Sequence, residues 1–248
     1  MTDHVYSGGF YDYIDAGSRA SARTVARLLL GEVKIGSLLD IGAGHGAWAA
    51  EWMAAGVPDV VAVDGDYVAR DRLAIPADRF RPHDLSQPLD LGRKFDLVQS
   101  LEVAEHLPAS AADGFVETLT RHGDAVLFSA AVPHQGGEHH VNEQPLSYWR
   151  AKFAARGYAP YDWLRPRIAA DRGVMPWYRF NTLIYANEAG AARLSSSIRE
   201  TCVPDAAPVD IPGDLRWRAR RAMVRLIPPV LVKPIAIAKA SVEARLRG

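Results

Sequence analysis

Cysteine is nearly absent, because Cys202 is the only one in 248 residues. A single thiol excludes an intrachain disulfide framework and fits a reducing compartment. No apolar run has the length needed to span a bilayer. Residues 1–7 contain neither the basic nor the apolar region of a secretory signal. We therefore expect a cytoplasmic protein.

An excess of charge of one sign is also absent, because 29 Lys and Arg residues balance 29 Asp and Glu residues. The total charge therefore gives no indication of a nucleic-acid partner. The distribution is uneven, since residues 214–248 contain nine Lys or Arg residues against two acids. Hydrophobic residues make up 48% of the chain, which is enough for the core of one α/β domain with additions.

Short apolar runs alternate with helix-like segments from residue 37 to about residue 130, which predicts a parallel sheet covered by helices on both faces. The predicted strands are 37–41, 59–63, 79–82, 95–100, 125–130, 158–164 and 180–186. A helix is predicted over 145–157, where Trp149 and Phe153 have helical spacing. The expected fold class is α/β, a Rossmann-like sheet of seven strands that is mixed but mostly parallel.

Four segments are predicted along the chain. Residues 1–36 form an N-terminal helical cap with a helix over 18–30. Residues 37–189 form the ligand-binding domain. Residues 190–213 are rich in Ser, Pro and Ala and are expected to be a linker. Residues 214–248 form a basic and apolar C-terminal extension.

A glycine-rich turn at Gly42, Gly44 and Gly46 carries most of the functional information. It connects an apolar strand to a helical segment, which is how a backbone comes close to a nucleotide-like ligand. Asp40 lies just before the turn and favours a cationic ligand group over a pyrophosphate. Asp64 ends the second strand, where an acid can accept hydrogen bonds from a ribose diol. The spacing differs from G-x-G-x-x-G and disfavours a nicotinamide dinucleotide.

This pattern, D-x-G-x-G-x-G followed by a strand-terminal acid, resembles the class I methyltransferases that depend on S-adenosyl-L-methionine (SAM). The resemblance implies that Asp40 lies near the methionine amine, that the glycines let the backbone pass SAM, and that Asp64 holds the ribose. It also places Asp84 on the adenine amino group, although a turn or helix-capping aspartate is an equal alternative. The expected SAM-binding residues are Asp40, Gly42, Ala43, Gly44, Gly46, Asp64, Gly65, Asp84, Leu85, Ser100, Leu101 and Glu102.

A second block, E-V-A-E-H-L-P, follows the predicted strand 95–100. On one helical turn, Glu102, Glu105 and His106 would face the same side, and two carboxylates with an imidazole can bind a divalent ion. The block resembles the E-x-x-E-H site of small-RNA 2′-O-methyltransferases and of some ubiquinone-pathway O-methyltransferases. It implies a Mg²⁺ or Mn²⁺ site formed by Glu102, Glu105, His106 and His140. Alternatively, Glu102 and His106 hold the loop by hydrogen bonds without a metal.

A third block follows the strand predicted over 125–130. Its residues 136–144 resemble the GG-x-x-H-V-N-E-Q pattern of a bacterial methyltransferase subfamily associated with glycan or secondary-metabolite biosynthesis. The chain departs from that pattern at His139 and Pro145, which affects the substrate pocket more than the SAM site. A hydroxyl acceptor must lose a proton, and a histidine suits that task. His140 is the candidate base, and His134 is the second choice.

The predicted function is SAM-dependent O-methylation of a sugar or a small secondary metabolite. N-methylation and a SAM-binding regulatory protein without turnover are the alternatives. The expected partner is a small-molecule acceptor, with no nucleic acid. The extension 214–248 either contacts a membrane peripherally or packs on its own domain or on a second subunit, as in a homodimer.

Overall fold

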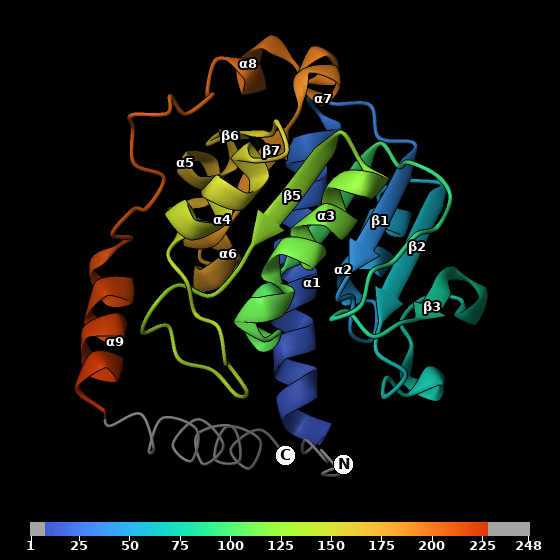
Figure 1. Cartoon of the computed structure of the whole chain (residues 1–248). Coiled ribbons are helices and arrows are strands. Elements are labelled where there is room, and N and C mark those ends of the chain that lie inside the picture. The colour runs from blue at the N-terminus through green and yellow to red at the C-terminus, as the bar shows by residue number, and fades with distance from the viewer. Residues whose placement is uncertain (1–7, 228–248) are drawn as a thin grey trace.

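The structure is a computed structural model that describes residues 8–227 (Figure 1). Its centre is one seven-stranded sheet with the order β3-β2-β1-β4-β5-β7-β6. Strands β1 to β5 pair in parallel, whereas β7 runs antiparallel to β5 and β6. The strands are β1 (Ser37–Ile41), β2 (Asp59–Asp64), β3 (Phe80–Pro82), β4 (Leu97–Leu101), β5 (Ala125–Ser129), β6 (Ala159–Tyr161) and β7 (Leu183–Ala186). The predicted fold class, a mixed and mostly parallel sheet of seven strands, is confirmed.

Helices cover both faces of this sheet (Figure 1). They are α1 (Gly8–Leu30), α2 (Ala47–Ala54), α3 (Ala112–His122), α4 (Leu146–Ala154), α5 (Leu164–Ile168), α6 (Pro176–Asn181), α7 (Glu188–Arg193), α8 (Ser196–Arg199) and α9 (Leu215–Leu226), with short 3₁₀ turns η1 (Arg70–Arg72), η2 (Ala77–Arg79), η3 (Ala104–His106) and η4 (Ala109–Ala111). Within residues 8–227, no helix combines the length and the apolarity that a membrane crossing requires.

Two cores lie on opposite faces of the sheet. Leu38 belongs to the core that contains Trp52 of α2, while its neighbour Leu39 belongs to the core that contains Phe115 of α3 and Trp149 of α4. This alternation follows from the period of two along a strand. A strand that is apolar on both faces must be covered on both, which explains why helices lie above and below it.

Several predicted boundaries differ from the structure. The strand predicted over 95–100 begins at Leu97, and Phe95 forms only an isolated bridge to Gly123. The strands predicted over 158–164 and 180–186 are shorter, because Leu164 begins α5 and Asn181 ends α6. Pro176 begins α6, where its missing N–H costs nothing. The N-terminal helix is longer than predicted, since α1 begins at Gly8.

Residues 190–213 are not a free connector, contrary to the predicted linker. Leu194, Ile198 and Val209 are buried in the two cores. The backbone N–H of Val203 donates to Pro160 O at 2.9 Å, so this segment runs along the free edge of β6. The few apolar residues of this segment are too widely spaced to show a helical or strand period. Its Ser, Pro and Ala content therefore suggested a linker although the segment is packed.

Helix α1 and its neighbours close the far face of the sheet. Arg23 forms an ion pair with Glu51 of α2 at 3.0 Å. Ser18 lies 3.3 Å from the hydroxyl of Tyr178 in α6, and Ser21 accepts from Met175 N at 3.0 Å. The helical part of the predicted cap therefore packs on the domain. Residues 1–7 and 228–248, including most of the predicted extension, lie outside the described residues.

Candidate functional site

The carboxyl ends of β1, β2, β4 and β5 lie at one edge of the sheet, which is where open α/β sheets bind ligands (Figure 1). Asp40 is 3% exposed there, and its Oδ2 has no hydrogen-bond partner among the described residues. Burial raises the pKa of Asp40 to about 7, and the nearby charge of Asp64 adds to this effect. A buried carboxyl with an unused oxygen is well suited to a cationic group that arrives with a ligand.

The three glycines of the turn after β1 all have positive φ, with values of 86° for Gly42, 54° for Gly44 and 84° for Gly46. Their surroundings differ. A Cβ on Gly42 would collide with the side chain of Val103, and one on Gly46 would press on Ile75, whereas a Cβ on Gly44 would meet nothing within 4 Å. Gly42 and Gly46 therefore allow close packing, and only Gly44 presents its backbone to open space.

Asp64 is connected to this turn by hydrogen bonds. Its Oδ2 accepts from Gly44 N at 2.6 Å, and its Oδ1 accepts from Gly65 N and from the Tyr67 hydroxyl, each at 2.6 Å. The carboxylate is thus fixed beside Gly44, and its predicted role on the ribose stays a prediction. Tyr67 is 80% exposed, so its phenol can leave Asp64 when another hydroxyl takes its place.

The other expected SAM-binding residues lie around the same edge. Asp84 is exposed and accepts from Ser86 N at 2.9 Å and from Ser86 Oγ at 2.7 Å, which lowers its pKa. This is the turn geometry of the alternative interpretation, and its adenine role stays a prediction. Ser100 and Leu101 are buried at the end of β4, and Leu85 is half-buried. Ala43 donates its N–H to Val63 O at 3.2 Å.

Glu102 has a strained backbone at the end of β4, with a φ of 57°. Its Oε2 accepts from Gln135 Nε2 at 2.6 Å and its Oε1 from Asn181 Nδ2 at 3.2 Å. Its N–H donates to Ser129 O at 3.0 Å. Burial raises the pKa of Glu102, although these hydrogen bonds oppose the shift. Strain of this kind is kept where surrounding contacts determine the conformation, which is common at functional sites.

Glu105 is fully buried, and neither of its carboxyl oxygens has a hydrogen-bond partner among the described residues. Its backbone oxygen accepts from Val141 N at 2.9 Å and Asn142 N at 3.0 Å, which holds the loop after β5 against η3. Burial raises the pKa of Glu105 well above its ordinary value, and the charge of Glu102 raises it further. An uncompensated acid in this position requires either a proton or a cation.

Three of the four predicted metal ligands come together. One ligand atom each from Glu105, His106 and His140 lies within 4.8 Å of the others. Glu102 lies outside this group, so the prediction that one helical turn aligns it with Glu105 and His106 is wrong. The helical turn spans only Ala104–His106, and the left-handed Glu102 directs its carboxylate to Gln135 and Asn181 instead.

His106 contacts His140 edge to face, with 5.0 Å between the ring centroids. Loss of hydration around the ring, together with the nearby His140, lowers the pKa of His106 to about 4, although part of the side chain is exposed. A neutral imidazole can accept a proton or coordinate a metal.

His140 is oriented by Glu143, whose Oε1 lies 2.8 Å from His140 Nδ1. Glu143 also accepts from Gly136 N at 2.8 Å and from His134 N at 2.9 Å. Burial opposes the charged form, but the hydrogen bond from His140 and these N–H groups bring the pKa of Glu143 below its ordinary value. The sequence analysis assigned no chemical role to Glu143, although its position three residues after His140 indicates that the two side chains can meet.

His134 is not part of the same cluster as His140. Its backbone has a φ of 66°, and its side chain lines a groove beside α9. His134 therefore lines a groove that does not include His140, although Glu143 binds both the backbone of His134 and the ring of His140. Gln135 and Asn181, which hold Glu102, also had no role in the sequence interpretation, because their spacing in the chain does not show that they meet.

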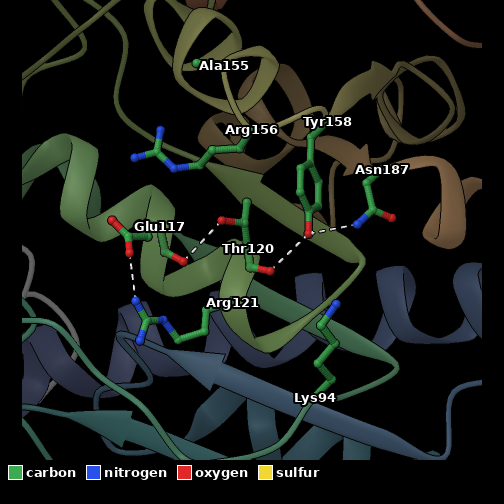
Figure 2. A pocket seen from close by; sticks show the side chains of 8 residues that line it. All are labelled: Lys94, Glu117, Thr120, Arg121, Ala155, Arg156, Tyr158 and Asn187. Carbon is green, nitrogen blue, oxygen red and sulfur yellow. Dashed lines mark hydrogen bonds and ion pairs between the residues drawn. The ribbon is translucent and has the colours of Figure 1, made fainter.

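A cavity of about 630 Å³ lies at the opposite, amino-terminal edge of the sheet, and Figure 2 shows the side chains that line it. The Tyr158 hydroxyl donates there to Thr120 O at 3.0 Å and lies 3.3 Å from Asn187 Nδ2. Its cationic side chains are paired with acids, as in Lys94 with Asp124 at 2.6 Å. This cavity is distant from Asp40 and Asp64, and its polar groups are already satisfied.

Comparisons with known proteins identify the family. Residues 12–159 match the family described as "Methyltransferase domain". No curated protein matches the sequence significantly. Because the family match covers more than half of the chain, the chain belongs to this family, and its sheet is that of the class I SAM-dependent methyltransferases. It is therefore an enzyme of the methyltransferase type.

Solved structures support the same fold. The sugar N-methyltransferase KedS8 from Streptoalloteichus is 17% identical, with a TM-score of 0.51 over 75% of this chain and 95% of that chain. DesVI from Streptomyces venezuelae is 16% identical, with a TM-score of 0.51 over 75% and 99%. An O-methyltransferase family protein from Burkholderia thailandensis is 14% identical, with a TM-score of 0.53 over 72% and 58%.

The glycine turn gives the first prediction. The variant Gly42→Ala should lower the free energy of unfolding by roughly 2–4 kcal/mol, because collision with Val103 adds to left-handed strain. Gly44→Ala should cost only about 1–2 kcal/mol but weaken SAM binding by about tenfold or more, because its Cβ enters the open space. Urea unfolding and calorimetric titration with SAM measure both effects. Unchanged SAM affinity in Gly44→Ala would show that the ligand does not pass there.

Asp40 gives a pH-dependent prediction. The folded protein keeps a proton on Asp40 up to a pKa of about 7, whereas the unfolded carboxyl loses it near a pKa of about 3.9. Between these values the folded state binds more protons, so this group lowers the free energy of unfolding as pH rises. Without SAM, the stability advantage of Asp40→Asn over the native protein should therefore grow by roughly 2–4 kcal/mol as the pH rises from about 4 to about 8.

Urea unfolding at several pH values measures this difference. The exposed Asp78→Asn variant is the control and should follow the native pH curve. An Asp40→Asn curve parallel to the native one would contradict the assignment.

Proposed function

We propose that this SAM-dependent methyltransferase transfers a methyl group to a hydroxyl of a sugar or a small secondary metabolite in the cytoplasm, with His140 as the base. The observation that carries the proposal is the 2.8 Å contact between His140 and Glu143 at the carboxyl edge of the sheet. A histidine base that a carboxylate orients is useful when the acceptor must lose a proton during the reaction.

The residues at this edge fit SAM. The unpartnered Oδ2 of Asp40 is available to the methionine amine, Gly44 leaves room for the nucleoside, and Asp64 is available to the ribose. When bound, SAM supplies a methyl group already activated by its sulfonium. The protein then has to exclude water and align the acceptor.

His140 would hold the transferred proton. A carboxylate only accepts hydrogen bonds, so Glu143 assigns the ring proton of the neutral imidazole to Nδ1. The lone pair of Nε2 is then left on the side of Glu105, whose Oε1 is 4.0 Å away. After Nε2 takes the proton of the acceptor hydroxyl, the negative charge of Glu143 stabilises the imidazolium.

N-methylation is the second candidate, because a fold neighbour is named a sugar N-methyltransferase. An amine acceptor that reacts as the free base has less need of a protein base. The His140–Glu143 pair therefore favours a hydroxyl acceptor. The similarity to a sugar N-methyltransferase favours a sugar as the molecule that carries the hydroxyl or the amine.

Replacement of His140 tests the base. In a screen of glycosides, amino sugars and phenols with SAM, we expect an O-methylated product by mass spectrometry. With that acceptor, His140→Ala should lower kcat by roughly 10²- to 10⁴-fold while SAM affinity stays native. Glu143→Gln should lower kcat less and shift the pH profile, because Glu143 acts by orienting His140.

Unchanged turnover in His140→Ala would end the role of His140. If His134→Ala reduced kcat instead, the base would be the second choice from the sequence. A product methylated only on nitrogen would favour the second candidate function.

The metal hypothesis gives a separate prediction. The cluster of Glu105, His106 and His140 offers one oxygen and two nitrogen ligands, a set that divalent transition metals accept, and the bare carboxyl oxygens of Glu105 fit an ion. If His140 is the base, a chelator should leave methyl transfer unchanged. Loss of activity in chelator, restored by Mg²⁺ or Mn²⁺, would instead make His140 a ligand and the ion a Lewis acid.

A further inference from the structure

Helix α9 is attached to the domain at its first turn. The Asp214 side chain accepts from Trp217 N at 2.8 Å and caps the helix. Trp217 is 3% exposed and lies against Phe180, with 5.7 Å between the ring centroids. The helix is therefore anchored by an aromatic contact, and Figure 1 shows it beside the long loop that follows β5.

Two arginines of α9 hold this loop. Arg221 donates to Pro133 O at 2.9 Å and 3.1 Å, and Arg220 donates to the carbonyls of Gln135 and Gly136 at 3.2–3.3 Å. The inner side of the same loop is held by Glu143, which binds the backbone of residues 134 and 136 and the ring of His140. Helix α9 is thus one loop away from the proposed base.

A groove of about 630 Å³ lies where α9 faces this loop, and it is lined by His134, Pro212, Arg218, Arg221, Ala222, Arg225 and Leu226. The α9 residues occur at intervals of three and four, so they form one face of the helix. The groove therefore brings three guanidinium groups and one imidazole together.

Within residues 8–227, no acidic side chain neutralises the positive charge of this groove. No acidic residue lines it, and neither Arg218 nor Arg225 forms an ion pair within residues 8–227. Arg221 donates to a neutral carbonyl and has no acidic partner among the described residues. In the cavity of Figure 2, by contrast, Lys94 and Arg121 are paired with acids.

We propose that this groove binds a phosphate group of the methyl acceptor. The inference rests on the proposed function and names its substrate class. Guanidinium groups bind phosphate oxygens through paired hydrogen bonds, and several of them can surround one dianion. A phosphate held between α9 and the loop would fix one end of the acceptor beside the loop that also carries His140, and fixing the acceptor in this way helps to align it for methyl transfer.

Direct binding of pyrophosphate, measured by titration calorimetry on the full chain, tests the groove. The double variant Arg218→Gln/Arg225→Gln should weaken binding by about tenfold or more. Arg216→Gln is the matched control, since Arg216 is an exposed arginine of the same helix that does not line the groove; it should stay within about twofold of native. Arg221 is left intact because it holds the loop.

A second arm identifies the source of the phosphate. Co-sedimentation with phosphatidylglycerol vesicles, compared with phosphatidylcholine vesicles, uses the same variants. If vesicle binding alone depends on Arg218 and Arg225, the phosphate belongs to a lipid headgroup; if pyrophosphate binding depends on them, it belongs to a soluble acceptor. Absence of both interactions, or an equal loss in Arg216→Gln, would overturn the proposal.

Titration of each variant with SAM separates this inference from the proposed function. Native SAM affinity without phosphate binding would reject the groove and leave the methyltransferase site intact. Loss of SAM binding in the native chain would reject the function itself.

Discussion

Three carboxyl groups with raised pKa values, those of Asp40, Glu102 and Glu105, lie at one edge of the sheet and are the constraint on which the site depends. Within residues 8–227, Asp40, Glu102 and Glu105 are paired with no Lys or Arg. Burial raises the pKa of each, and a buried charge without a partner is costly. These carboxyl groups thus lower the stability of the unliganded protein, and a cationic ligand bound at this edge would offset that cost.

The loop after β5 connects this acidic edge to the rest of the molecule. On the inner side of the loop, Glu143 accepts hydrogen bonds from two backbone N–H groups and binds the His140 ring. On the side of α9, Arg220 and Arg221 donate to carbonyl groups of the loop. The left-handed residues His134 and His139 occur in the same loop. Such conformations persist only when neighbouring contacts determine them, and here the contacts come from both sides.

Local patterns in the sequence were enough to predict the sheet and to place Asp40 and Asp64 at its carboxyl edge. Alternating strands and helices have a clear period, and the positions of Asp40 and Asp64 follow from strand ends. Glu143, Gln135 and Asn181 were missed because their roles arise from contacts between distant segments. The deviation of Glu102 from a helical turn and the packing of residues 190–213 were missed for the same reason. The roles of individual residues in catalysis remain predictions.

The segment shared with the methyltransferase family ends at residue 159, whereas Trp217 and the arginines of α9 lie well beyond it. The groove is therefore built from both sides of this boundary, since His134 lies within the family segment and the arginines of α9 lie beyond it. A substitution on the groove face of α9 therefore changes the groove while the glycine turn and Asp64, which do not line it, keep their contacts.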